Sequence, residues 1–191
     1  AEKFFKEVLN NNPEQLESIF FLGIIQSKRK DFNKAKDFFI KVIEIDSNYI
    51  DAHYNLGIVF NELKDFKNAI NCYEKVIQID SKHADAHNNL GLVFYKLGEF
   101  QNSINHYKKA IQVDSNNTQA YNNLGNSLTR LEKNKEAIEY YKKAYKINNY
   151  NETLLINLAG AYQIDAEFEK SKKTLKEIHT NFPKNTITII I

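Results

Sequence analysis

A step of 34 residues runs through the chain and limits what it can fold into. One three-residue motif recurs at this step, with a leucine before a small residue in every copy: Phe21-Leu22-Gly23, Asn55-Leu56-Gly57, Asn89-Leu90-Gly91, Asn123-Leu124-Gly125 and Asn157-Leu158-Ala159. Small residues share a second register, at Ala35, Ala69, Ser103, Ala137 and Ser171. Large residues share a third, at Phe39, Tyr73, Tyr107, Tyr141 and Leu175. Self-similarity at such a period is typical of a solenoid built from one supersecondary unit.

Each period has the apolar spacing of two helices joined by a short turn. Leu56, Phe60 and Leu63 follow each other at i, i+4 and i+7, as on one face of a helix. A second apolar stripe begins at Phe66, and the polar pair at residues 64–65 separates the two stripes. A single hairpin of this kind cannot bury its apolar face alone, so stacking has to stabilise the array.

The small residues of the repeat have a steric role in this prediction. We expect Gly57 to lie where the two helices of a hairpin cross, with Ala69 opposite, because small side chains let helix axes approach closely. The large side chains Leu56, Phe60 and Tyr73 are expected to fill the space toward neighbouring hairpins.

The pattern resembles the tetratricopeptide repeat family, which has a leucine–glycine pair, a small residue twelve positions on and an aromatic residue four further. The resemblance implies an all-α fold, a right-handed α-solenoid of stacked antiparallel helical hairpins. It divides the chain into the second helix of a truncated repeat at 1–15, repeats at 16–49, 50–83, 84–117, 118–151 and 152–185, and the start of a further element or tail at 186–191. Both ends lack a polar capping face, which favours a fragment or ends covered by a partner in a larger complex.

The junctions between repeats depart from the family pattern. The family's proline is replaced by Asn149 and by three serines that each follow an aspartate, in the pairs Asp46-Ser47, Asp80-Ser81 and Asp114-Ser115. Serine and aspartate are preferred N-cap residues, so we expect them to cap the helix that follows.

Composition excludes several classes of protein. Lys+Arg 26 against Asp+Glu 24 gives a net charge of +2, too balanced for a protein that mainly binds nucleic acid. No apolar run approaches the roughly 18 residues of a membrane span. The single cysteine, Cys72, excludes an internal disulfide framework and fits a reducing compartment. We predict a cytoplasmic location, with a ciliary or organellar assembly as the alternative.

Catalytic and cofactor motifs are missing from the sequence. All six glycines lie at or beside repeat positions, so none is left to form a phosphate-binding loop. His83 and His87 have the i, i+4 spacing of a helical metal pair, but His87 and His53 occupy the family's aromatic packing position. We therefore interpret these histidines as packing residues and Cys72 as an inert thiol. The sequence predicts no enzyme in this region, no cofactor and no metal.

In this family the first helices of successive repeats line a concave face where ligands lie. Here that face carries a recurring asparagine at 55, 89, 123 and 157, which we call the asparagine row: Asn55, Asn89, Asn123 and Asn157. The neighbouring candidates for peptide binding are Tyr54, Asn88, Asn122, Asn126 and Tyr95. The row resembles the asparagine ladder in the repeats of O-linked N-acetylglucosamine transferases, whose amides hold the backbone of an extended polypeptide. An amide can pair with a peptide C=O and N–H together.

Another binding mode of the family does not fit. Chaperone-cofactor repeats clamp a terminal carboxylate with basic residues, but the corresponding positions here are not basic, and Asp51 and Asp85 are acidic. Lys28, Lys96 and Arg130 recur near the ends of first helices, where cations complement the helix dipole or contact an acidic partner.

The favoured function is a scaffold or adaptor for protein or peptide partners, with an extended segment bound along the concave groove. Two alternatives stay open: the substrate-recruiting arm of a larger glycosyltransferase-like enzyme, and a structural subunit of a large assembly.

Overall fold

The computed structural model describes residues 1–183, and all regular secondary structure in that range is α-helical. The helices are α1 (Glu2–Asn11), α2 (Leu16–Lys28), α3 (Phe32–Ile45), α4 (Ile50–Glu62), α5 (Phe66–Ile79), α6 (Ala84–Lys96), α7 (Phe100–Val113), α8 (Thr118–Arg130), α9 (Asn134–Ile147), α10 (Glu152–Ile164) and α11 (Phe168–Asn181). They form two compact units, Ala1–Val93 and a second that begins at Phe94, so the division falls within α6. The expected element at 186–191 lies outside the described residues.

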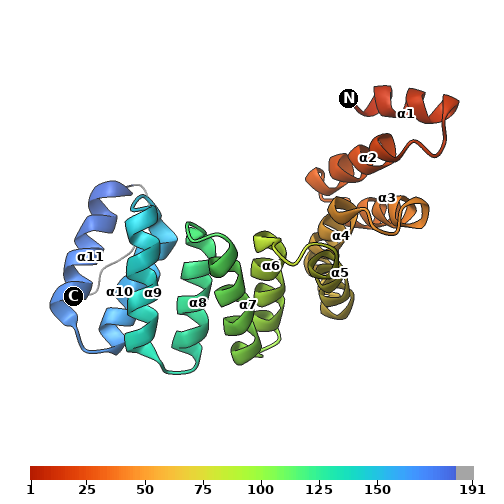
Figure 1. Ribbon diagram of the computed structural model, residues 1–191. Coiled ribbons are helices and arrows are strands. Elements are labelled where there is room, and N and C mark those ends of the chain that lie inside the picture. The colour runs from red at the N-terminus through yellow and green to blue at the C-terminus, as the bar shows by residue number, and fades with distance from the viewer. Residues whose placement is uncertain (184–191) are drawn as a thin grey trace. The chain divides into compact units, whose positions relative to one another are not determined.

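The helices alternate between two types. First helices (α2, α4, α6, α8 and α10) have 13 residues and start every 34 residues, and second helices (α3, α5, α7, α9 and α11) have 14. Within the second unit, α8 packs against α7 and α9, and α10 packs against α9 and α11, as Figure 1 shows. Within the first unit, α4 packs in the same way against α3 and α5. The predicted all-α solenoid of helical hairpins is confirmed.

A left-handed residue ends each first helix. Lys30, Lys64, Glu132 and Ala166 have φ near +60°, and Gly98 has φ +80° at the equivalent position. One residue later, the carboxylate of Asp31 or Asp65 accepts the backbone N–H three residues on and caps the second helix. The polar pair expected at 64–65 therefore forms a tight turn, and its second residue, Asp65, is the N-cap of α5.

The capping expected at the junctions between repeats is wrong. The aspartates end the preceding second helix, and each carboxylate accepts the backbone N–H two residues on, at 2.9–3.0 Å in the Asp46, Asp80 and Asp114 turns. The next helix is too far along the chain for these side chains to reach. In α8 and α10 it is capped by Asn117 and Asn151, which accept from the N–H three residues on. The aspartates form local Asx turns instead.

The glycine of the repeat lies beneath an aromatic ring of its own hairpin. A Cβ at Gly57 would lie 2.7 Å from Cε1 of Tyr73, and one at Gly125 would lie 2.4 Å from Cε1 of Tyr141. Both rings are buried. A small residue is indeed needed at the helix crossing, but the group that faces it is the tyrosine ring rather than Ala69. The tyrosines therefore fill the hairpin itself, whereas we expected them to face neighbouring hairpins.

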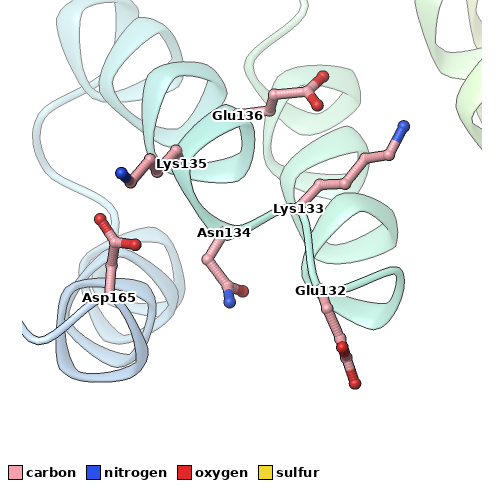
Figure 2. A pocket seen from close by; sticks show the side chains of 6 residues that line it. All are labelled: Glu132, Lys133, Asn134, Lys135, Glu136 and Asp165. Carbon is pink, nitrogen blue, oxygen red and sulfur yellow. The ribbon is translucent and has the colours of Figure 1, made fainter.

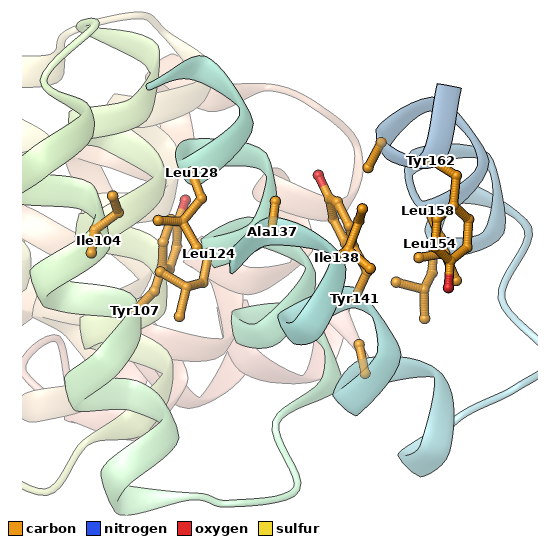
Figure 3. Packing of buried hydrophobic residues seen from close by; sticks show 12 residues of the cluster. Ile104, Tyr107, Leu124, Leu128, Ala137, Ile138, Tyr141, Leu154, Leu158 and Tyr162 are labelled. Carbon is orange, nitrogen blue, oxygen red and sulfur yellow. The ribbon is translucent and has the colours of Figure 1, made fainter. Parts of the chain in front are cut away.

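The core of the second unit runs without interruption from one hairpin to the next. Figure 3 shows Leu124 and Leu128 from α8, Tyr141 from α9, and Leu154 and Leu158 from α10 in one buried cluster. A corresponding cluster in the first unit joins α2, α3, α4 and α5. Because the apolar contacts cross from hairpin to hairpin, stacking stabilises each unit, as expected for a repeat array.

Candidate functional site

The asparagine row occupies the same turn in each of four first helices. Asn55, Asn89, Asn123 and Asn157 occupy equivalent positions in α4, α6, α8 and α10, and all four are half-buried. A half-buried amide has some atoms within the protein and some at the surface. A row amide can bind a ligand only through N–H or C=O groups that are not already bonded within the protein.

Two members of the row bond to the preceding first helix of their own unit. In the first unit, Asn89 Nδ2 donates to Tyr54 Oη at 3.0 Å. In the second unit, Asn157 Nδ2 donates to Asn122 Oδ1, also at 3.0 Å. The partner lies 35 residues upstream in both cases. Asn89 and Asn157 thus link adjacent first helices, a structural role that was not predicted from the sequence.

Asn55 makes a different bond because its upstream partner is different. The residue 35 positions before it is Phe20, whose side chain has no acceptor. Asn55 Nδ2 instead donates to the backbone carbonyl of Asp51 in its own helix, at 2.8 Å.

Three of the other residues predicted for this face lie close to the row. Tyr54 and Asn122 are half-buried acceptors of the bonds just described, and burial raises the pKa of Tyr54 above its ordinary value, so its hydroxyl stays protonated. Asn88 is only 3% exposed, so its placement on an open binding surface is wrong. Its Nδ2 donates to Asn89 Oδ1 at 3.4 Å.

The second unit contains an open groove of about 320 Å³ on its first-helix side. It is lined by Tyr95 from α6, Asn126, Thr129 and Arg130 from α8, Tyr141 from α9, and Ile156, Asn157, Gly160, Ala161 and Ile164 from α10. The groove thus contains three of the predicted binding residues, Tyr95, Asn126 and Asn157. Its lining combines amides and hydroxyls with exposed aliphatic side chains, the mixture expected of a binding site.

A hydrogen-bond chain fixes one wall of the groove. Tyr141 Oη donates to Asn126 Oδ1 at 2.7 Å and lies 3.4 Å from Thr129 Oγ1. Thr129 Oγ1 donates in turn to the backbone carbonyl of Gly125, at 3.0 Å. Burial raises the pKa of Tyr141 to about 12, so the phenol remains a donor at neutral pH and holds the Asn126 amide in one orientation.

Ile156, Gly160 and Ile164 line the groove but were not predicted from the sequence. One signal was present. The small residue of the last repeat is Ala159, in register with the earlier glycines, so Gly160 stands one residue out of register and has no counterpart among them.

The histidines and the cysteine lie at packing positions. His87 is buried, and its Nε2 lies 3.3 Å from the Ser81 carbonyl oxygen; His53 Nε2 lies 3.0 Å from that of Ser47. Burial raises the pKa of the Cys72 thiol to about 12, which keeps it in the unreactive protonated form at neutral pH. Within residues 1–183, no group of three or more His, Cys, Asp or Glu side chains has an arrangement that could hold a metal ion.

A second hollow of the second unit, about 310 Å³, lies at the hairpin turns (Figure 2). Around it lie charged side chains of both signs and Asn134, which replaces the phenylalanine found at Phe32, Phe66, Phe100 and Phe168. Asn134 Oδ1 is the one buried side-chain oxygen or nitrogen without a hydrogen-bond partner in the described part of the chain. The mixed charges favour neither an anionic nor a cationic ligand.

Comparison with known families identifies the repeat. A TPR repeat model matches residues 59–98, and two tetratricopeptide repeat models match residues 82–149 and 16–49. The chain belongs to the tetratricopeptide repeat family. Arrays of this family are typically non-catalytic and contact other proteins.

Several solved structures have the same fold. YrrB, described as a TPR protein with an unusual peptide-binding site, has 21% identity and a TM-score of 0.75, covering 97% of this chain and 95% of its own. PilF of Pseudomonas aeruginosa has 24% identity and a TM-score of 0.80, covering 87% and 76%. MamA of Desulfovibrio magneticus RS-1 has 15% identity and a TM-score of 0.81, covering 90% and 97%. No curated protein sequence matches the chain significantly.

None of the helices described for residues 1–183 combines the length and the apolar character needed to cross a membrane.

Proposed function

We propose that this chain is a protein-interaction scaffold that holds an extended segment of another protein along its first-helix face. The asparagine row is the observation that carries the proposal, because it places the same hydrogen-bonding group on one turn of successive first helices. We also propose that the scaffold is built from five repeats, at residues 16–49, 50–83, 84–117, 118–151 and 152–185.

The chemistry of the amide supports this reading. An asparagine side chain offers two N–H donors and a carbonyl with two acceptor sites. Asn157 uses one N–H to link first helices, so a second N–H and acceptor capacity remain for a ligand. The internal bond also holds this amide in place before binding, which lowers the entropy lost when a partner docks.

The spacing of the row suits an extended chain. Neighbouring packed helices lie roughly 8–10 Å apart, and an extended polypeptide rises about 3.3 Å per residue. Within each unit, one row amide would therefore meet about every third residue of the bound segment. Contacts of this kind involve the backbone, so the scaffold would accept many sequences along the row. The peptide-binding site named for YrrB is a precedent within the same fold.

Replacement of the row by alanine tests the proposal. The variant carries Asn55→Ala, Asn89→Ala, Asn123→Ala and Asn157→Ala, and its control carries Asn33→Ala and Asn105→Ala, two exposed asparagines of second helices. Both are measured for helicity by circular dichroism and for capture of a displayed library of random linear peptides. We expect both to fold and only the row variant to lose captured peptides. Equal capture by the row variant and the wild type would exclude the row as the binding element.

A further inference from the structure

The floor of the groove in the second unit contains a glycine that the fold does not require. Ile156, Gly160 and Ile164 lie four residues apart on α10, so they share one face of the helix. A Cβ at Gly160 would meet nothing within 4 Å, and its φ is not positive. Glycine is disfavoured in a helix interior relative to alanine, so neither packing nor backbone conformation explains it.

This glycine opens a gap between two exposed aliphatic side chains. Ile156 is 42% exposed and Ile164 is 60% exposed. We call the space above Gly160, with an isoleucine at each end, the Gly160 notch. Its walls are apolar, and its backbone base admits a group that any larger residue would exclude.

The opposite side of the groove offers hydrogen-bond donors and one positive charge. Arg130 is the single charged residue that lines the groove, and it is exposed. Its guanidinium lies 5.3 Å from the centroid of the Phe100 ring. An arginine beside an aromatic ring can still donate several of its five N–H groups to a carboxylate. Among residues 1–183, no carboxylate forms a salt bridge with Arg130.

Asn126 and Asn157 complete the groove with amides whose orientations are fixed. Tyr141 Oη donates to the oxygen of Asn126, and Asn157 donates one N–H to Asn122. The NH₂ group of Asn126 and the second N–H of Asn157 can then donate to backbone carbonyls of a bound segment.

We infer that this groove selects segments with a branched aliphatic side chain and, close to it along the strand, an aspartate or glutamate. The aliphatic side chain fills the Gly160 notch between Ile156 and Ile164, and the carboxylate pairs with Arg130 in a charge-assisted hydrogen bond. The inference rests on the proposed function and adds to it: the asparagine row contacts the backbone, whereas the groove supplies preference for side chains.

Peptide display on the full chain tests this inference. The probe is a library of random linear peptides, and the bound pool is sequenced. We expect enrichment of Val, Ile or Leu with Asp or Glu at a constant short offset. Burial of one aliphatic side chain is expected to improve affinity about tenfold or more.

Two variants separate the two parts of the groove. A Cβ at Gly160 would meet no atom within 4 Å, so we expect Gly160→Leu to fill the notch, to gain helix propensity and to fold. We expect it to lose the aliphatic preference, whereas Gln163→Leu, on the exposed side of the same helix, keeps it. Arg130→Gln should lose the acidic preference alone, whereas Lys108→Gln, exposed on α7, keeps it.

The outcomes distinguish this inference from the proposed function. Peptides that bind through the asparagine row but show no aliphatic–acidic pattern would overturn the groove inference and leave the scaffold intact. So would a pattern that survives both Gly160→Leu and Arg130→Gln. If no peptide is enriched by the wild-type chain, the inference and the proposed function fail together.

Discussion

The two units place a tyrosine ring on a first-helix glycine in the same way, yet the second unit contains a further glycine with no ring above it. Tyr73 covers Gly57 in the first unit, and Tyr141 covers Gly125 in the second. Gly160 faces open space. The same residue type in the same kind of helix therefore serves packing when it lies in the 34-residue register. Out of that register, it shapes a surface.

Replacement by leucine should change the free energy of unfolding very differently at the two kinds of glycine, and this is the largest effect we expect. Gly125→Leu has to displace the buried Tyr141 ring, which costs about 1–3 kcal/mol in unfolding free energy. Gly57→Leu should behave similarly because the first unit has the same arrangement. Gly160→Leu should instead be neutral or stabilising by up to about 1 kcal/mol. Urea unfolding followed by circular dichroism measures all three.

The comparison breaks if Gly160→Leu destabilises the chain as much as Gly125→Leu. The groove would then be closed in solution, and the notch would not exist.

Alkaline pH should weaken the second unit through the ring on Gly125. Burial raises the pKa of Tyr141 from 10.0 to about 12. Between these values the unfolded chain loses the phenolic proton while the folded chain keeps it. The stabilisation is therefore complete below pH 10 and declines as pH rises to about 12, by on the order of 2 kcal/mol. Tyr141→Phe should remove this part of the decline in thermal melts taken across that range.

Tyr150→Phe provides the control because Tyr150 is 66% exposed. A Tyr141→Phe melt with the same alkaline decline as the wild type would show that Tyr141 titrates freely in the folded state.

The periodic residues made most of the fold predictable, and the residues that break the period account for what was missed. The 34-residue step and the apolar spacing predicted the helices because burial follows the same register in every hairpin. The bonds of the row were not predictable in this way. They depend on the residue 35 positions upstream, which changes from Phe20 to Tyr54 to Asn122. The Gly160 notch was not predictable from the sequence either. Whether an aromatic ring covers a glycine depends on how the two helices pack, and the spacing of residues along the chain does not give that.

A buried hydroxyl pair distinguishes the core of the second unit from that of the first. Ser103 Oγ and Ser127 Oγ lie 2.6 Å apart and are fully buried. The equivalent positions of the first unit hold Ala35 and Val59. Ser127→Ala alone leaves the Ser103 hydroxyl without this partner and should cost about 1–2 kcal/mol. The double variant with Ser103→Ala should be nearly neutral, because it removes both polar groups.

A double-mutant cycle in urea measures this coupling. Strictly additive costs would mean that the hydroxyl pair contributes no interaction energy.

The smallest expected effect compares two members of the asparagine row. Asn157→Ala removes a bond between first helices and should cost about 0.5–1.5 kcal/mol, partly offset by the better helix propensity of alanine. Asn55→Ala removes only a bond to its own helix, so the same propensity gain should leave it neutral or slightly stabilised. The difference between the two urea midpoints isolates the contribution of the link between helices, because the propensity change is common to both. If the two midpoints agree, the link adds nothing to stability. A packing role would then not explain asparagine at residue 157, and the ligand would be the better physical reason for an amide there.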